Sequence, residues 1–270
     1  MGFVEDLILR HPCRGMDILR PWLPVDFCQA AAELILCWPQ GGTVLLTTGF
    51  YVAGHAETDG PPGTLLLAKA LRTLGYRPVV VTDALCRGYF ERGGIACTYL
   101  DVDASDEMLT ALLERLAPVG MISVERCGRN DDGDYANMRG ISIAEHTAPL
   151  DRLFELSEVP TVAIGDGGNE VGMGNLAKQI REELALTPCR VTVDRLIIAT
   201  VSNWGALGLC ACLGSLPSET ELEEAYLLAQ ELGYVDGVIR ECVLSEDGFP
   251  LDVVRSLHHE LTNMPACCRA

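Results

Sequence analysis

The chain has 270 residues, of which 49% are hydrophobic and 21% are charged, and this balance excludes an intrinsically disordered protein. The formal net charge of −18 at pH 7 excludes nucleic acid and anionic membranes as primary partners, because such a surface repels both polyanions. With only 20 lysines and arginines, the protein must concentrate its positive groups wherever it binds an acidic ligand.

The twelve cysteines are scattered, mostly inside apolar runs, and none forms a CxxC pair. This pattern predicts reduced thiols and no structural zinc site. Residues 1–15 lack a basic region followed by an apolar core and a cleavage site, so no secretory signal is expected. No apolar run reaches the roughly 18 residues that a transmembrane helix needs. The sequence therefore predicts a cytoplasmic protein.

Short β-branched runs alternate with longer segments of helical periodicity after an opening helical segment at 26–37. The predicted strands are 43–48, 77–83, 96–102, 120–125, 161–166 and 195–202. The predicted helices are 64–74, 107–116, 144–156, 176–184, 219–232 and 251–261. Continuous apolar strands that alternate with helices predict an α/β fold, a mostly parallel doubly wound (Rossmann-like) sheet with helices on both faces. Without repeats or linkers, we expect one domain over residues 1–270.

Polar residues follow five of the six predicted strands. In an open parallel sheet, ligands bind beyond the carboxyl ends of the strands, near the point where the strand order reverses. The residues that we expect around one cleft are Gly49, Asp83, Glu125, Asp166 and Asn203.

The segment IGDGGNEVGMGN (164–175) is rich in glycine, which permits tight turns and close approach of the backbone to a ligand. Its free amides at a helix start favour an anion. Asp166, Asn169 and Glu170 add carboxylate and amide groups that a simple turn does not need. The alternative is a plain glycine-rich turn. The spacing matches neither the dinucleotide-binding fingerprint nor the P-loop.

The two long loops, 49–63 and 126–140, also carry candidate functional groups. In the first loop, His55, Glu57 and Asp59 are candidates for a base or for metal ligands. In the second loop, the guanidinium groups of Arg126 and Arg139 suit binding of carboxylates. The alternative for both loops is a solvated charged segment. His258 and His259, in the last predicted helix, are expected at the surface.

Several long runs make the chain resemble the D-glutamate cyclase family over approximately residues 1–262. They are TTGFYVAGHAETDGPPGT, VVVTD, SVERCGRNDDGDYANMRG, IGDGGNEVGMGN and SNWGA. The resemblance implies a carbon–oxygen lyase (a hydro-lyase) that converts D-glutamate to 5-oxo-D-proline and water. The α-amine would attack the γ-carboxyl group and close a five-membered lactam, which is feasible without ATP because the two groups belong to one molecule.

This reaction requires a neutral amine, an acid that helps hydroxide to leave, and donors for the developing oxyanion. The candidates for catalytic residues are Asp166, Glu170 and Asp59. The candidates for substrate binding are Thr48, Gly49, Asp83, Arg126, Arg139, Gly167, Gly168, Asn169 and Asn203. Glu125 and Asp166 are the candidate ligands of a divalent cation such as Mn²⁺, and the sequence leaves open whether any cofactor is needed.

The expected partner is a small acidic amino acid, and the oligomeric state is left open. Two other functions remain as alternatives. One is an enzyme that binds a nucleotide or a phosphate ester, and the other is a non-catalytic protein that binds an acidic amino acid.

Overall fold

The computed structural model describes residues 2–264. A six-stranded sheet forms its centre, with the strand order β5-β4-β1-β6-β7-β8 and parallel pairing throughout. The strands are β1 (Thr43–Thr47), β4 (Arg77–Thr82), β5 (Ala96–Tyr99), β6 (Pro118–Val124), β7 (Thr161–Gly165) and β8 (Arg195–Ile198). The predicted α/β fold with a doubly wound parallel sheet is confirmed.

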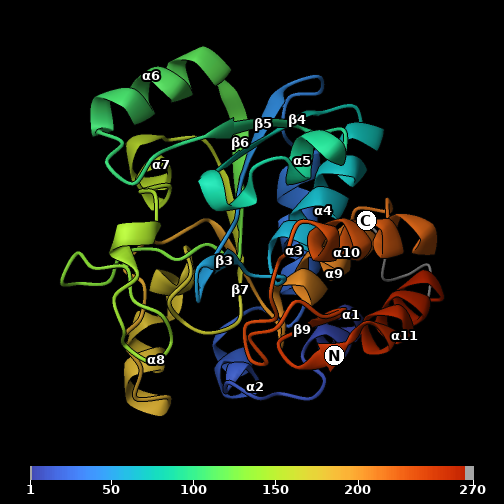
Figure 1. The fold of residues 1–270 in the computed structure, drawn as a ribbon. Helices are drawn as coiled ribbons and strands as arrows, with labels where there is room; N and C mark the ends of the chain where they lie inside the picture. Colours follow the sequence, from blue (N-terminus) through green and yellow to red (C-terminus); the bar gives the residue numbers. More distant parts are fainter. Residues whose placement is uncertain (1, 265–270) are drawn as a thin grey trace.

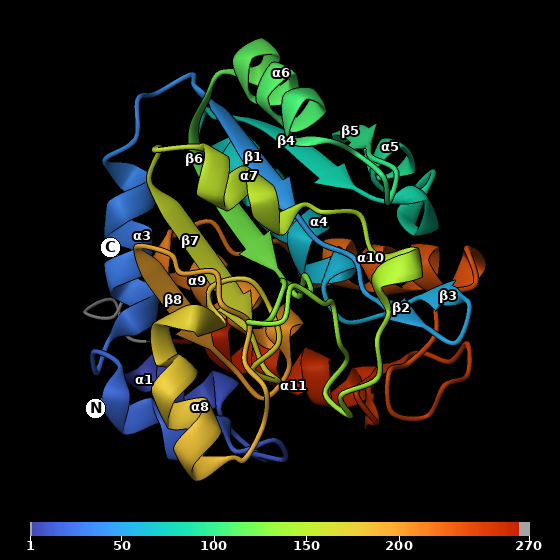
Figure 2. The same cartoon turned by 90° about the vertical axis from the view of Figure 1, so that its left-hand side faces the viewer.

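Helices cover both faces of this sheet (Figure 1). One face carries α3 (Phe27–Leu36), α4 (Pro61–Thr73) and α9 (Ser202–Cys212), and the other carries α6 (Asp106–Leu116), α7 (Asp151–Leu156) and α8 (Ala177–Glu183). Figure 2 shows α6, α7 and α8 in front of the strands, with α4 and α9 behind them. Because both faces are covered, β1 and β7 are buried at every residue.

An outer layer lies on the face that carries α9. Helix α10 (Glu219–Glu231) packs on α4, and α11 (Leu251–Thr262) packs on α9. All 11 residues of α9 are consequently buried. Three short helices, α1 (Phe3–Ile8), α2 (Met16–Leu19) and α5 (Tyr89–Arg92), complete the set of α-helices in residues 2–264.

The structure differs from the sequence-based expectation in two places. The predicted strand 195–202 ends at Ile198, and α9, which was not among the predicted helices, begins at Ser202. The segment 144–156 is not continuous, because a 3₁₀ turn at Ala144–His146 precedes an extended Thr147, and α7 begins only at Asp151. Pro149 explains the interruption, since a proline disfavours the helical conformation of the residue before it.

Two small hairpins occupy segments that the sequence analysis left unassigned. The first pairs β2 (Tyr51–Val52) with β3 (His55–Ala56), and the second pairs β9 (Ser245–Glu246) with β10 (Phe249–Pro250). Each strand has two residues, too few to produce a detectable alternation. Within residues 2–264, every helix is too short or too polar to cross a lipid bilayer.

The strand order reverses between β1 and β6, which lie side by side at the centre of the sheet. The chain leaves β1 toward α4 on one face and returns to β6 from α6 on the other face. A crevice is therefore expected beyond the carboxyl ends of these two strands.

Candidate active site

A cavity of about 390 Å³ lies beyond the carboxyl ends of β1, β6 and β7. Its walls come from the loops that follow these three strands, from the loop that precedes β9, from the turn between β9 and β10, and from Arg14. The polar side chains that line it are Arg14, Tyr51, Glu57, Glu125, Asn137, Arg139, Ser142, His146, Asn169, Glu170, Arg240 and Asp247.

Seven carboxylates are buried in and around this cavity, each with at most 8% of its surface exposed. We call them the carboxylate cluster: Glu57, Asp59, Glu125, Asp166, Glu170, Glu246 and Asp247. Glu57, Glu125, Glu170 and Asp247 line the cavity. The other three are buried without lining it, so the cluster extends from the cavity wall into the protein.

The start of α9 holds two members of the cluster. The backbone amide of Ser202 donates to Asp59 Oδ2 at 2.9 Å and to Asp166 Oδ2 at 3.1 Å, and the amide of Asn203 donates to Asp59 Oδ1 at 2.8 Å. Unpaired amides at a helix start favour negative charge, which accounts for two carboxylates side by side at this position. The carboxylate oxygens of Asp59 and Asp166 thus accept hydrogen bonds that hold the segment before α4 and the residue after β7 against the start of α9.

Glu125 follows β6 with a φ of 46°, in the left-handed region that non-glycine residues rarely adopt. Such a conformation costs of the order of 1–3 kcal/mol and is found at sites where the surrounding structure enforces it. The side chain is held by Ser202, whose Oγ donates to Glu125 Oε2 at 2.6 Å. The unusual backbone turns this carboxylate toward the cavity wall at the centre of the sheet.

The glycine-rich loop after β7 wraps around its own carboxylate. The amide of Gly168, which has a φ of 100°, donates to Glu170 Oε2 at 2.8 Å. A Cβ atom on Gly167 would lie 2.7 Å from Glu170 Oε1, so only glycine fits there without displacing that side chain. The amide of Gly168, a candidate for substrate binding, is therefore already bonded to a side chain.

Arg14 and Asp247 belong to the site although no sequence motif indicated them. Arg14 forms ion pairs with Asp166 and with Asp247, and its side chain is 11% exposed. Asp247 is placed by the loop that begins at Asp236, whose fully buried carboxylate accepts bonds from the amides of Val238 and Gly248, each at 2.8 Å. Neither Arg14 nor Asp247 follows a strand of the sheet or belongs to a glycine-rich segment, so no local pattern marks them.

Burial raises the pKa of every member of the cluster, and neighbouring carboxylates raise most of them further. The pKa of Asp59 rises to about 8, and those of Glu246 and Asp247 rise to about 7. Burial alone would lower the pKa of Arg14, but Asp166 and Asp247 raise it well above its usual value, so this guanidinium stays charged. One arginine cannot neutralise seven buried carboxylates, so the cluster must also hold protons or another cation.

The sequence-predicted residues divide into those that line the cavity and those that do not. Lining residues are Glu57, Glu125, Arg139, Gly167, Asn169 and Glu170. His55 is exposed and does not line the cavity. Thr48, Gly49, Asp59, Asp83, Arg126, Asp166, Gly168 and Asn203 do not line it.

Arg126 is fully buried and ties adjacent loops together. It donates to Asp83 Oδ2 at 2.6 Å, to the carbonyl oxygen of Gly49 at 2.8 Å and to that of Ala148 at 2.6 Å. Asn203 has a similar role, because its Oδ1 accepts from the amides of Gly60 and Gly63 at the start of α4. These contacts connect parts of the protein, and they leave Arg126, Asp83 and Asn203 outside the cavity wall.

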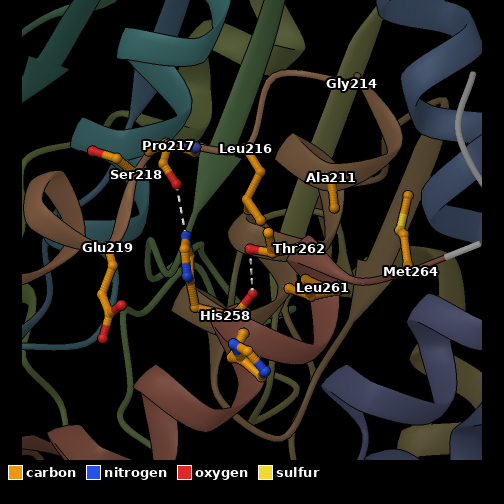
Figure 3. A pocket seen from close by; sticks show the side chains of 11 residues that line it. Ala211, Gly214, Leu216, Pro217, Ser218, Glu219, His258, Leu261, Thr262 and Met264 are labelled. Carbon is orange, nitrogen blue, oxygen red and sulfur yellow. Dashed lines mark hydrogen bonds between the residues drawn. The ribbon is translucent and has the colours of Figure 1, made fainter.

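A second cavity, of about 440 Å³, lies between the loop after α9 and the last turn of α11 (Figure 3). His259 is exposed there as predicted, whereas His258 is buried, which corrects the expectation that both lie at the surface. The Nε2 atom of His258 lies 2.6 Å from the carbonyl oxygen of Pro217, a contact that joins α11 to the loop before α10. Among the described residues, Glu219 is the one carboxylate that lines this second cavity, whereas four carboxylates line the cavity at the strand ends.

The strand order and the position of the site define a doubly wound α/β protein with its candidate active site at the switch point. The chain belongs to the D-glutamate cyclase-like, C-terminal family, whose model matches residues 4–262.

A curated relative is the human protein named D-glutamate cyclase, mitochondrial, which is 31% identical over 199 residues. The match covers 63% of this chain and 32% of the human protein, so the chain spans about a third of that relative's length. Because that relative is named a mitochondrial protein, the cytoplasmic location of this chain stays a prediction.

Two solved structures show low similarity. The enzyme WbmH of Bordetella bronchiseptica in complex with NAD⁺ is 15% identical, with coverage of 72% of this chain and 54% of its own and a TM-score of 0.31. The glycosyltransferase SsfS6 of Streptomyces sp. SF2575 is 13% identical, with coverage of 83% and 97% and a TM-score of 0.32. These values are too low to support an argument about this protein.

Proposed function

We propose that this protein is a lyase that converts D-glutamate to 5-oxo-D-proline and water. The family to which it belongs and the curated relative support the reaction. The observation that carries the proposal is the cavity wall formed by Glu57, Glu125, Glu170 and Asp247, whose pKa values are all raised by burial. Carboxyl groups with raised pKa values can both accept and donate protons near neutral pH.

In the proposed reaction, the α-amine nitrogen forms a bond to the γ-carbon of the same molecule, and one carbon–oxygen bond of the γ-carboxyl group breaks. The substrate ammonium first loses one proton so that its nitrogen becomes a nucleophile, and the nitrogen loses a second proton as the lactam forms. The departing oxygen receives two protons and leaves as water. Glu57 is our candidate for the group that takes a proton from the amine, because it lines the cavity, its pKa is raised by burial, and it is not one of the metal ligands proposed below. Asp247, with a pKa of about 7, is a candidate proton donor to the departing oxygen.

Asp166 lies at the centre of the cluster, since it belongs to two groups of three carboxylates whose oxygens approach within 4.8 Å of one another. In one group, Asp59, Asp166 and Asp247, two of the three members are already paired with Arg14. The other group consists of Glu125, Asp166 and Glu170.

We propose this second group as the ligands of a divalent cation such as Mn²⁺. The residues fit the ion, because three buried carboxylates supply the hard oxygen ligands that Mn²⁺ and Mg²⁺ prefer, and because the cluster lacks enough positive charge of its own. When bound, such a cation supplies electrostatic stabilisation of negative charge on the γ-carboxyl oxygens. Arg14 would hold Asp166 and Asp247 in place beside it.

The test is to incubate the purified protein with D-glutamate or L-glutamate, each with Mn²⁺ or with a chelator, and to quantify 5-oxoproline. We expect 5-oxoproline from D-glutamate, with a higher rate in Mn²⁺ than in the chelator. Absence of product in all four mixtures would refute the proposed lyase activity. Saturable binding of D-glutamate without product would instead favour a non-catalytic amino-acid-binding protein, and stabilisation by ATP alone would favour a nucleotide-binding enzyme.

A further inference from the structure

Two loops that are distant in sequence form the mouth of the cavity. The first is the segment 137–143, which includes the end of the long loop after β6, and the second is the segment 237–240, which precedes β9. Both contribute lining residues to the same cavity, so their side chains approach a ligand from different parts of the chain.

Each of these loops carries one arginine, Arg139 in the first and Arg240 in the second. Within residues 2–264, neither guanidinium forms an ion pair, in contrast to Arg14, which is paired with Asp166 and Asp247. The protein has a net charge of −18 and only 20 lysines and arginines. Two unpaired arginines at one cavity mouth therefore indicate an anionic ligand group.

The loop of Arg240 is rigidly held. The Asp236 carboxylate accepts from the amides of Val238 and Ile239, each at 2.8 Å, and the Arg240 amide donates to the carbonyl oxygen of Asp236 at 2.7 Å. Arg240 has a φ of 62°, in the region that favours glycine. Glycine would adopt this backbone conformation with less strain than arginine does. The fold alone therefore does not account for an arginine at position 240.

Exposed apolar side chains flank both arginines. Met138 and Ile141 lie in the first loop, and Val238 and Ile239 lie in the second, with 42% to 58% of their surfaces exposed. Apolar groups around a cavity mouth mark a surface that a ligand covers. They also reduce the access of water to the guanidinium groups once a ligand is bound, which strengthens the ion pairs.

The charges of the cavity are arranged in two regions. The wall beneath the mouth contains four carboxylates, which attract an ammonium group and repel a free carboxylate: Glu57, Glu125, Glu170 and Asp247. At the mouth, Arg139 and Arg240 attract a carboxylate and repel an ammonium group. A substrate with one ammonium group and a carboxylate that takes no part in the chemistry would bind with that carboxylate at the mouth.

We propose that Arg240, together with Arg139, binds the α-carboxylate of the substrate and thereby determines specificity for amino acids with a free α-carboxylate. This inference rests on the proposed function for the identity of the substrate. Because the α-carboxylate does not change during the cyclisation, Arg240 binds the ground state and the transition state equally. Its loss should therefore raise KM and leave kcat nearly unchanged.

The experiment compares Arg240→Ala with the parent on D-glutamate and on the α-amide of D-glutamate, which keeps the amine and the γ-carboxyl group. We expect KM for D-glutamate to rise about 10- to 100-fold, the range for losing hydrogen bonds to a charged group. The KM for the α-amide should change less than about threefold. Arg115→Ala, at an exposed arginine in the last turn of α6, is the matched control and should leave both values unchanged.

Arg240→Gly separates binding from folding, because glycine accepts the φ of 62° without strain. We expect its Tm to equal or exceed that of the parent while KM for D-glutamate rises as in Arg240→Ala. A KM for D-glutamate within about twofold of the parent in both variants, or an equal rise for the α-amide, would overturn the assignment. If the parent makes no 5-oxoproline, the proposed function fails, and calorimetric binding of D-glutamate then tests Arg240 by the same comparison of variants.

Discussion

Arg14 and Asp166 are separated by 152 positions in the sequence, yet the Nη1 atom of Arg14 lies 2.5 Å from Asp166 Oδ1. The same guanidinium also reaches Asp247. A residue near the amino terminus therefore connects the end of β7 to the loop after β9, and it supplies positive charge within the carboxylate cluster. The buried Asp166 and Asp247 carboxylates are therefore both paired with a single arginine.

Arg14→Gln should destabilise the protein by about 3–5 kcal/mol near pH 8, because it leaves two buried carboxylates without their cation. Denaturant unfolding near pH 8 and near pH 5.5 measures the effect, and the loss should be smaller at the lower pH, where the carboxylates hold protons. Arg255→Gln removes an exposed pair with Glu223 and Asp252, which solvent screens, and should destabilise the protein far less than Arg14→Gln does. Equal losses for the two variants would contradict the central position of Arg14.

The stability of the protein should fall as the pH rises from about 5 to about 8. The folded pKa values of Asp59, Glu246 and Asp247, about 8, 7 and 7, lie above the ordinary values of these side chains, 3.8, 4.5 and 3.8, so the folded protein binds more protons than the unfolded chain in this range. The stabilisation is complete below the unfolded pKa values and is lost as the pH rises through the folded ones. Measurement of the Tm across this pH range tests whether the stability falls, as predicted, or rises with pH.

Glu246→Gln should make the stability less dependent on pH, because it removes a group that contributes up to one proton to the difference in proton binding between the folded and unfolded states. The substitution keeps the shape of the side chain. Glu246 Oε1 accepts from Trp204 Nε1 at 2.7 Å and Glu246 Oε2 accepts from the Tyr226 hydroxyl at 2.6 Å. The glutamine oxygen can replace only one of these acceptors, so the variant should also be less stable than the parent across the pH range. Glu231→Gln, at an exposed glutamate in α10, is the control and should leave the slope unchanged. A slope in Glu246→Gln identical to that of the parent would show that Glu246 does not titrate with folding.

Added Mn²⁺ should raise the Tm, and the rise should be larger near pH 8 than near pH 6, because protons compete with the cation for the carboxylates. Glu125→Gln removes one of the three proposed ligands and should abolish most of the rise. Calorimetry with and without a chelator provides the measurement. A rise in Tm that is the same in Glu125→Gln and the parent would place the ion elsewhere.

Asp236→Asn tests whether the loop before β9 positions the site. The carboxylate accepts from two hydrogen-bond donors with Oδ1 and from two others with Oδ2, and an asparagine amide group cannot accept at its nitrogen. We expect a fall in stability of about 1–3 kcal/mol and a loss of cyclisation that exceeds what the fall in Tm explains. Asp252→Asn, at an exposed position of α11, should affect neither, and equal behaviour of the two variants would contradict the positioning role.

The sequence was sufficient to predict the sheet and its polar edge, because polar residues follow five of the six predicted strands and the parallel fold collects them at one edge. Glu125 and Glu170 were identifiable in this way. Arg14 and Asp247 were not, since they enter the site from irregular segments near the two ends of the chain. Arg126 illustrates the opposite difficulty, because a sequence does not distinguish a guanidinium that binds a ligand from one that pairs with Asp83 inside the protein.

The most direct test of the proposed active site is the cyclisation rate of Asp166→Asn. Asp166 belongs to both groups of close carboxylates, and the substitution keeps the size of the side chain while it removes the charge. If its Tm matches that of the parent, we predict a fall of about 10²–10⁴-fold or more in the rate of 5-oxoproline formation from D-glutamate. A rate within a few-fold of the parent in a variant that melts like the parent would contradict the assignment of the carboxylate cluster as the active site.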